Sequence, residues 1–211
     1  MVNLNELQEA IVAGKLEVTV ELAENAIKEG IEPQQIITDY MIPGMKEIGA
    51  RFEAGKAFVP HLLMSSRAMK GALEILKPLM KGGQNTSYGT VVIGTVKGDL
   101  HDIGKNLVAI MLAGCGFEVI NLGVDISIEK FVQSVQDNNP DILCMSSLLT
   151  TTMEQMHQVI VALQDAGLRS KVKIMVGGSP VSKSFARNIG ADGYSSNANG
   201  AVAVARQLLG R

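Results

Sequence analysis

The chain has 211 residues, of which 46% are hydrophobic, and its 19 Lys and Arg against 21 Asp and Glu give a net charge of −2. This length allows one large domain or two small ones with a buried core, and the near-neutral charge argues against a protein that binds nucleic acid through many phosphate contacts. Only three His and two Cys are present, so a metal or redox function would depend on very few side chains.

No segment is typical of membrane insertion or secretion. The longest apolar run, Leu107 to Phe117, is shorter than the ~20 residues that span a bilayer. The N-terminal residues have neither the basic start nor the apolar stretch of a secretory signal. We therefore expect a cytoplasmic protein without membrane attachment, in which Cys115 and Cys144 are reduced core thiols.

The N-terminal part of the chain shows helical periodicity only, which predicts a cap of four amphipathic helices. Glycines end the first two helices. The third begins at Pro33 and should bend at Pro43, and the fourth begins at Pro60. The expected apolar positions, helix by helix, are Leu4, Leu7 and Ile11; Val18, Leu22 and Ala26; Ile37, Met41, Met45, Ile48 and Phe52; and Leu62, Ser66, Met69, Leu73, Leu76 and Met80.

A change of pattern separates this cap from the rest of the chain. The stretch from Lys81 to Ser87 is polar, Gly-rich and without periodicity, which is typical of a linker. We expect a helical cap domain at residues 1–82, a linker at 83–88 and a second domain at 89–211.

Beyond the linker, short β-branched segments alternate with helical ones. Five strands that alternate with five helices predict an α/β domain with a Rossmann-like (flavodoxin-like) parallel sheet covered on both faces. In such sheets, ligands bind at the carboxyl ends of the strands. The expected strands are Thr90–Val96, Glu118–Leu122, Asp141–Ser146, Lys173–Val176 and Gly193–Ser195, and the expected helices lie near 104–115, 127–138, 153–167, 180–189 and 198–209.

The loop after the first strand does not have the pattern of a nucleotide-binding loop. It lacks the Gly-x-Gly-x-x-Gly pattern of dinucleotide-binding sites. Five residues, not four, separate Gly98 from Gly104-Lys105, and Asn106 stands where a P-loop needs Ser or Thr.

The same loop places a His two residues after an Asp. A His that ligates a metal usually donates its second ring N–H to a carboxylate, and Asp99 is placed to accept from His101. One protein ligand cannot hold a bare zinc ion, so any metal would have to arrive inside a cofactor that supplies the other ligands. A polar loop with a surface His remains the alternative.

Three blocks of sequence are spaced in a way that resembles a known signature. Asp99-x-His101-x-x-Gly104 is followed after 41 residues by Ser146-x-Leu148, and after a further 28 by Gly177-Gly178. This pattern resembles that of the base-off, His-on cobalamin-binding domains, and the helical half is similar to the cap found in methionine synthase and in small corrinoid proteins of methyltransferase systems.

The resemblance implies a cobalamin or related corrinoid cofactor with His101 as the lower axial cobalt ligand. Asp99 would be the hydrogen-bond partner of His101, and Thr152 would continue this axial-ligand relay. The rest of the first loop would contact the corrin, and the later loops would hold the displaced nucleotide tail. The further cofactor-binding residues implied are Gly98, Leu100, Asp102, Ile103 and Gly104, and then Ser146, Leu148, Thr150, Gly177, Gly178, Asn197 and Ala198.

In the cap, the resemblance implies that Phe52, Val59 and Leu62 shield the upper, methyl-bearing face of the corrin. Ordinary bundle core is the alternative for these three residues. His61 faces either solvent or the upper face, and His157 is expected to be a solvated helix residue.

By this resemblance, the protein is a methyl carrier that alternates between methylcobalamin, as methyl-Co(III), and Co(I). It would be a component of a multi-protein system, not a complete enzyme, with a substrate-specific methyltransferase, a second methyltransferase serving tetrahydrofolate or coenzyme M, and a reductive activase as partners. The donor stays open among methanol, methylamines, methoxylated aromatics and betaines. The alternatives are the small subunit of an adenosylcobalamin mutase and a cobalamin-based sensor. The first generally lacks a cap, and the second carries an additional DNA-binding domain.

Overall fold

The computed structural model describes residues 3–80 and 88–210, apart from the side chain of Lys77. The chain divides into two compact units, one of Met1–Ser87 with Ile110–Gly116 and the other of Tyr88–Ala109 with Phe117–Arg211. The expected linker at 83–88 lies outside the described residues except for its last position. We describe each unit by itself.

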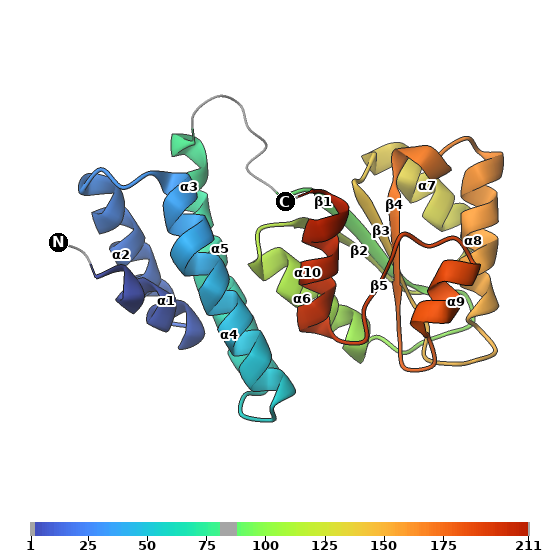
Figure 1. Ribbon diagram of the computed structural model, residues 1–211, viewed down its shortest axis with the longest axis horizontal. Coiled ribbons are helices and arrows are strands. Elements are labelled where there is room, and N and C mark those ends of the chain that lie inside the picture. Colours follow the sequence, from blue (N-terminus) through green and yellow to red (C-terminus); the bar gives the residue numbers. More distant parts are fainter. Residues whose placement is uncertain (1–2, 81–87, 211) are drawn as a thin grey trace. The chain divides into compact units, whose positions relative to one another are not determined.

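The N-terminal unit is helical, as predicted (Figure 1). Asn3 caps its first helix by accepting a hydrogen bond from the Asn5 N–H at 3.2 Å. Three segments, α3, η1 and α4, follow one another without a break and form the third predicted helix. The elements are α1 Leu4–Val12, α2 Leu16–Lys28, α3 Pro33–Ile36, η1 Ile37–Met41, α4 Ile42–Glu53, α5 Val59–Leu76 and η2 Lys77–Leu79.

Pro43 is accommodated by a wider helical turn just before it. Segment η1 is a π-helical turn, in which the Ile42 N–H donates to the Ile37 carbonyl five residues earlier. A proline inside an α-helix has no N–H and crowds the carbonyl four residues back. Where the sequence predicts a bend at Pro43, the structure has a π turn inside an otherwise continuous helix.

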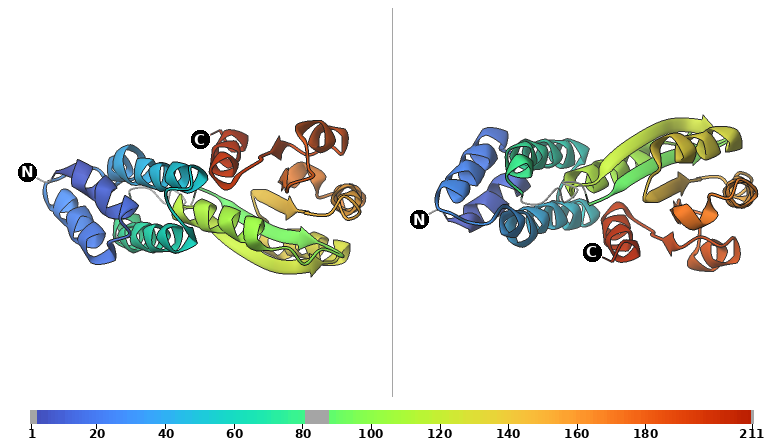
Figure 2. Two further views of the ribbon diagram at one scale, coloured as in Figure 1. Left: turned by 90° about the horizontal axis from the view of Figure 1, so that it is seen from below. Right: turned by 90° about the horizontal axis from the view of Figure 1, so that it is seen from above.

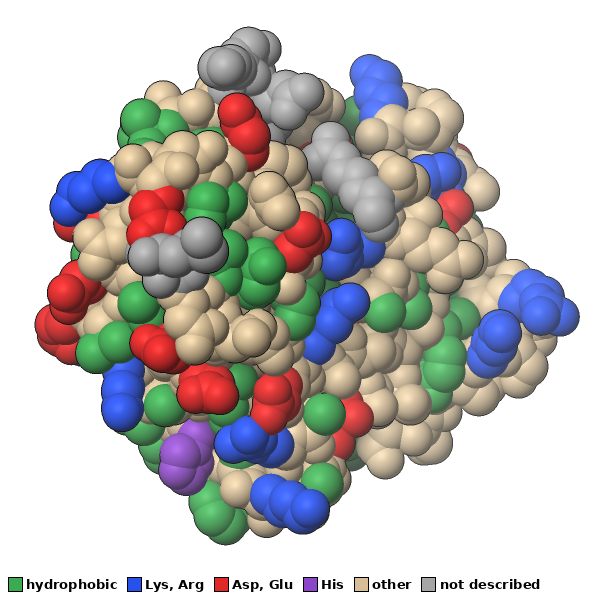
Figure 3. All heavy atoms as spheres, turned by 60° about the vertical axis from the view of Figure 1, so that its left-hand side comes forward, with side chains coloured by type: hydrophobic (Ala, Val, Ile, Leu, Met, Phe, Trp, Pro, Cys, Tyr) green, Lys and Arg blue, Asp and Glu red, His purple; other side chains and the backbone are tan. Residues whose placement is uncertain are grey.

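Apolar side chains from these helices form the core of the unit. Most predicted positions are buried, but Val18 is exposed and Ser66 is only half-buried. Ser65, next to it, is buried and donates to the Val12 carbonyl at 3.2 Å. Acidic side chains gather on the exposed faces of α1 and α2 (Figure 3), a distribution that repels polyanions. The largest fully buried side chains here are Leu7, Ile11, Ile36, Met41, Ile42, Met45, Leu62, Met69 and Leu76.

The second unit has a five-stranded, all-parallel sheet in the order β2-β1-β3-β4-β5. The predicted α/β class with N-terminal helices and a parallel sheet is therefore confirmed. The central strands are almost fully buried, as expected for a sheet covered on both faces. The strands are β1 Thr90–Val96, β2 Glu118–Ile126, β3 Ile142–Ser146, β4 Lys173–Gly177 and β5 Gly193–Tyr194.

Helices cover both faces of this sheet (Figures 1 and 2). Helices α7, α8 and α9 pack on one face, where Phe131, Met156 and Ile160 join the strand residues in one apolar core. Helices α6 and α10 lie on the other face. The helices are α6 Ile103–Gly114, α7 Ile128–Asn138, α8 Glu154–Asp165, α9 Lys183–Asn188 and α10 Ala198–Leu208, with a short turn η3 at Arg169–Lys171. Cys115 and Cys144 are both buried and form no disulfide with each other.

Two expected boundaries differ from the structure. Strand β2 continues to Ile126, four residues beyond the predicted end at Leu122, because irregular positions at Gly123 and Asp125 let the ladder continue past a glycine. Helix α9 spans only Lys183–Asn188, since Ser182 caps it by accepting the Phe185 N–H at 3.1 Å.

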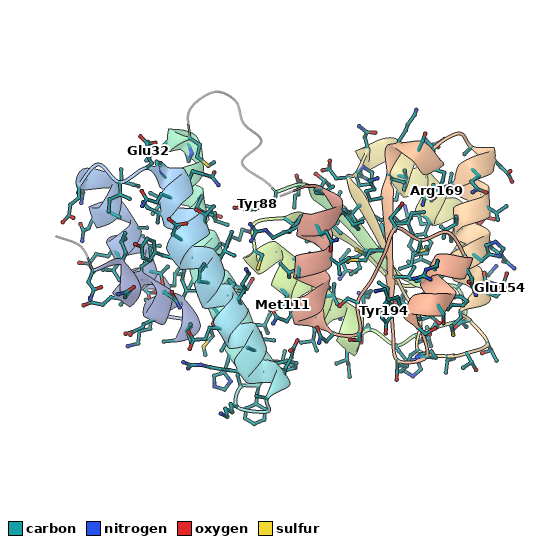
Figure 4. The ribbon with its side chains drawn as sticks, in the orientation of Figure 1. Glu32, Tyr88, Met111, Glu154, Arg169 and Tyr194 are labelled. Atoms are coloured by element: carbon teal, nitrogen blue, oxygen red, sulfur yellow. The ribbon has the colours of Figure 1, made fainter. Side chains whose placement is uncertain are left out.

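Arg169 (Figure 4) ties two turns of this unit together at the amino end of β4. Its guanidinium donates to the Gly190 carbonyl at 2.7 Å and to Asp192 Oδ2 at 2.9 Å. The same Asp192 oxygen accepts the Ile174 N–H at 2.7 Å. This carboxylate therefore has a purely structural role. No helix among the described residues is long and apolar enough to cross a membrane.

Candidate functional site

The sequence blocks singled out above meet at one edge of the sheet. Thr95, Ser146 and Gly177 are aligned across β1, β3 and β4, so the loops that follow these strands lie side by side. The first loop includes Gly98, Asp99, Leu100, His101 and Asp102 and leads into Ile103 and Gly104 of α6. Leu148, Thr150 and Thr152 follow β3, Gly178 follows β4, and Asn197 and Ala198 begin α10.

His101 is held by the carboxylate two residues before it. The distance between His101 Nδ1 and Asp99 Oδ1 is 2.7 Å, and the same oxygen accepts the His101 backbone N–H at 3.0 Å. Asp99 is fully buried, whereas 52% of the His101 side chain is exposed. The loop thus buries the orienting group and presents the imidazole to solvent.

The second oxygen of Asp99 receives three more hydrogen bonds. The Leu148 N–H donates to Oδ2 at 2.6 Å, the Leu149 N–H at 3.3 Å and the Thr152 hydroxyl at 3.2 Å. Burial raises the pKa of the Asp99 carboxyl, but the hydrogen bonds from His101, Leu148 and Leu149 outweigh it and hold the pKa well below its usual range.

This ionisation state determines the tautomer of the histidine. An ionised carboxylate only accepts hydrogen bonds, so the proton between the two side chains lies on His101 Nδ1. In the neutral ring, the lone pair is then on Nε2. A ring nitrogen with a free lone pair, on an imidazole fixed from behind by a carboxylate, has the properties of a metal ligand.

A second buried hydroxyl supports Thr152. Ser147 Oγ lies 2.8 Å from Thr152 Oγ1, and each of the two hydroxyls is within 3.1 Å of the Leu149 carbonyl oxygen. Ser147 is fully buried. The sequence does not predict a role for Ser147, because it is the variable position of the Ser-x-Leu block.

The surroundings of His101 suit a large, flat, partly apolar ligand. A β-carbon at Gly104 would lie in open space, with no heavy atom within 4 Å, so a ligand can approach the start of α6 closely. Exposed large apolar side chains are uncommon on solvated surfaces, yet four occur next to this imidazole, three on the two loops and one at the start of α6. They are Leu100, Ile103, Leu148 and Leu149, the first two being 72% and 75% exposed.

The later loops are built from small residues, for reasons that differ between positions. A β-carbon at Gly178 would lie 1.8 Å from the Ser147 carbonyl oxygen, so this glycine allows the β3 loop to pack against the β4 loop. Asn197 caps α10 by accepting the Gly200 N–H at 2.6 Å. Ser146 and Gly177 are half-buried, and Thr150 is exposed.

The residues selected in the cap lie where α4 ends and α5 begins. Phe52 is half-buried, Val59 is exposed and Leu62 is fully buried. His61 is exposed, and its Nδ1 accepts the Phe58 N–H at 3.0 Å. Since Phe58 precedes the helix and His61 is its third residue, this bond is one half of a capping box, which gives the imidazole a structural role at the start of α5.

A buried lysine lies near the start of α6. The Lys105 ammonium donates to Asn121 Oδ1 at 2.8 Å and to Asn106 Oδ1 at 2.6 Å, and Asn106 Nδ2 donates to Asp102 Oδ2 at 2.9 Å. Burial lowers the pKa of Lys105, and the charge of Asp102 partly opposes this shift. This network connects β2 to the first loop and was not expected from the sequence.

No group of three or more His, Cys, Asp or Glu that could bind a metal ion occurs among the described residues. A metal at this edge would therefore need ligands from a cofactor, with one position left for His101. The buried Asp99, the Nε2 lone pair, the apolar rim and the open space at Gly104 all fit a corrinoid, which brings four nitrogens of its own.

Comparison with known proteins agrees with this chemistry. Two family models, both described as B12 binding domain, match residues 89–203 and residues 4–77. The chain belongs to the B12-binding family. Its cofactor is accordingly a cobalamin-type corrinoid. The chain is 44% identical over 207 residues to the dimethylamine corrinoid protein of Methanosarcina barkeri, covering 98% of this chain and 97% of the relative.

Further relatives extend along almost the whole chain. A trimethylamine corrinoid protein of Methanosarcina mazei is 43% identical over 195 residues, covering 92% of this chain and 89% of its own. Among solved structures, a cobalamin-binding protein from Desulfitobacterium hafniense matches with a TM-score of 0.79 and 30% identity over 99% of both chains. A chain of the methanol:cobalamin methyltransferase complex from Methanosarcina barkeri matches with a TM-score of 0.77 and 31% identity over 98% of this chain and 79% of that one.

Proposed function

We propose that this B12-binding protein carries a methyl group between a methyltransferase specific for a methylamine and a second methyltransferase that serves tetrahydrofolate or coenzyme M. The relatives named as dimethylamine and trimethylamine corrinoid proteins, which align with 92–98% of this chain, favour methylamines among the donors left open by the sequence. A cytoplasmic location and a reductive activase as a third partner are part of this proposal.

The observation that carries the proposal is the hydrogen bond between His101 and Asp99. When bound, the corrinoid supplies a cobalt that accepts and releases the methyl group. His101 Nε2 serves as the lower axial ligand in place of the cofactor's own base. Asp99 holds the ring and its tautomer, and Thr152 stabilises the carboxylate from the other side.

The other residues implied by the resemblance keep their proposed roles around this ligand. The first loop from Gly98 to Gly104 contacts the corrin, and its apolar side chains exclude water from the lower face. Phe52 and Val59 would shield the upper face, whereas Leu62, which is fully buried, belongs to the core of the helical unit. The proposed domains, 1–82 and 89–211, enclose the two ranges matched by the family models. The displaced nucleotide tail occupies the β3, β4 and α10 loops, with Ser146, Leu148, Thr150, Gly177, Gly178, Asn197 and Ala198 as its contacts.

Axial ligation by His101 can be tested with a matched control. We would reconstitute wild type, His101→Ala and His157→Ala under anaerobic conditions with cobinamide, a corrinoid that lacks the nucleotide base, and record the Co(II) electron paramagnetic resonance spectrum. His157 pairs with Glu154 at 3.0 Å and is a second His–carboxylate pair in the same unit. Nitrogen splitting from a protein ligand should be lost in His101→Ala only. An unchanged spectrum in His101→Ala would overturn the assignment.

The methyl donor needs a separate test. The reconstituted protein would be mixed with methyltransferases specific for dimethylamine, trimethylamine and methanol, each with its substrate, and the upper ligand of the cofactor identified by mass spectrometry in the dark. We expect methylation with a methylamine enzyme and none with the methanol enzyme. An adenosyl upper ligand in the purified protein would instead support a mutase subunit.

A further inference from the structure

Asp125 lies at an irregular position of the edge strand β2. Between the pairs Gly94↔Gly123 and Val96↔Ile126, two residues of β2 face one residue of β1, so the strand bulges there. Asp125 has a φ of 55°, one of two positive values among the described non-glycine residues. A bulge redirects a side chain and often occurs next to a functional site.

The bulge brings Asp125 against the loop that carries the proposed axial ligand. Asp125 Oδ1 accepts the Gly98 N–H at 2.7 Å, and the Asp125 N–H donates to the Asp99 carbonyl at 3.0 Å. The two-residue segment Gly98-Asp99 is therefore held at both ends by one residue of the neighbouring strand, through the N–H that begins it and the carbonyl that ends it. Gly98 itself has a φ of 80°, a conformation that glycine adopts without strain.

Core packing does not explain this arrangement. The Asp125 side chain is exposed, and a left-handed backbone is unfavourable for a residue with a side chain, although Asp and Asn tolerate it better than most. Such strain persists only where surrounding contacts define the conformation, and it concentrates at functional sites. The side chain and the backbone N–H of Asp125 each make a hydrogen bond to this loop, at Gly98 and at Asp99.

We propose that Asp125 is a positioning residue for the axial ligand, acting through the backbone on either side of the Gly98-Asp99 segment. With that segment fixed, the Asp99 carboxylate stays aligned with His101 Nδ1 on one side and with the β3 loop on the other. This inference rests on the proposed role of His101. It adds the edge strand β2, which lies outside the three sequence blocks, to the elements that set the ligand geometry.

Three substitutions separate the contributions of Asp125. Asp125→Asn keeps an oxygen acceptor for Gly98 and tolerates a positive φ. Asp125→Gly removes the acceptor without adding strain, and Asp125→Ala removes it and adds strain. Asp192→Ala is the control, since Asp192 also accepts a backbone N–H in the same unit but at the opposite end of the sheet.

The first measurement needs no cofactor. Hydrogen exchange of the Gly98 amide, followed by NMR in the apoprotein, should be about tenfold faster in Asp125→Gly and Asp125→Ala than in wild type, because the amide loses its acceptor. Asp125→Asn should restore slow exchange. Asp192→Ala should lower thermal stability and leave Gly98 exchange unchanged.

The second measurement uses protein reconstituted with cobinamide, so that any nitrogen splitting comes from the protein. The ratio of histidine-ligated to unligated Co(II), read from the nitrogen splitting, should fall about tenfold in Asp125→Gly and return in Asp125→Asn. If His101→Ala loses the splitting while Asp125→Gly and Asp125→Ala match wild type in both measurements, the role of Asp125 is overturned and that of His101 stands. If His101→Ala keeps the splitting, the proposed ligand fails, whereas the Gly98 exchange still reports on Asp125.

Discussion

The Asp99 carboxylate accepts two hydrogen bonds from His101 through one oxygen, from the ring Nδ1 and from the backbone N–H. Both the position of the imidazole and the direction of its plane are therefore set by a single buried atom. Because Asp99 has no exposed surface and His101 is half-exposed, solvent reaches the imidazole but not the carboxylate that orients it.

Replacing Asp99 with Asn should weaken axial ligation without removing the ligand. An amide has only one oxygen, so one side of the residue would present N–H groups either to His101 or to the backbone donors of the β3 loop. Loss of such an orienting partner typically costs about 10–100-fold in metal affinity. Cobalamin titration followed by absorption would measure this loss. Glu154→Gln, which alters the matched partner of His157, should bind as wild type does, and equal binding by Asp99→Asn would contradict the role of Asp99.

The stability contributed by Asp99 should depend on pH on the acid side only. Its pKa is lower in the folded protein than the ordinary value of about 3.9, so the contribution is complete above pH ~4 and is lost as the pH falls further. At neutral pH, Asp99→Asn should lower the free energy of unfolding by about 1–3 kcal/mol. Urea unfolding of both proteins from pH ~7 to ~3 should show this difference shrinking below pH ~4. A difference that stays constant would mean that these hydrogen bonds do not lower the pKa of the Asp99 carboxyl.

Lys105 should make the free energy of unfolding depend on pH on the alkaline side. Burial lowers its pKa in the folded state, so between that pKa and the unfolded value of about 10.4 the unfolded chain binds more protons, and stability rises with pH. The free energy of unfolding of wild type relative to Lys105→Met should therefore increase as the pH approaches ~10. Urea unfolding of the two proteins at several alkaline pH values would test this, and a relative stability that falls with pH would rule out a desolvated ammonium.

The close approach of the β3 and β4 loops predicts a large effect at Gly178. Alanine there would place its β-carbon 1.8 Å from the Ser147 carbonyl oxygen at a φ of 132°, so we expect a loss of more than about 3 kcal/mol in the free energy of unfolding. Gly190→Ala is a suitable control, since its φ is 81° but no heavy atom lies within 4 Å. It should cost only about 1–2 kcal/mol. Equal losses in urea unfolding would show that strain, not the contact with Ser147, determines the effect.

The main features of the fold and the site were predictable because they leave local patterns. Alternating strands and helices predicted the parallel sheet, and the spacing of Asp99, His101 and Gly104 predicted that His101 would pair with Asp99 on the first loop. Ser147 and Asp125 could not be predicted as site residues because their roles depend on tertiary contacts. No local pattern indicates that a carboxylate in β2 will accept the Gly98 N–H. Gly123 interrupts the β-branched pattern of β2, so the sequence does not predict that the strand continues to Ile126.

The two buried hydroxyls behind Asp99 allow two arrangements of protons on one set of heavy atoms. Thr152 has a single proton, and both Asp99 Oδ2 at 3.2 Å and the Leu149 carbonyl at 3.0 Å can accept it, while Ser147 lies 2.8 Å away as donor or acceptor. When the Thr152 hydroxyl turns from Asp99 to the Leu149 carbonyl, Asp99 loses a hydrogen-bond donor and its carboxylate becomes more basic. The basicity of the Asp99 carboxylate can therefore change through a hydroxyl rotation alone, without any displacement of the backbone.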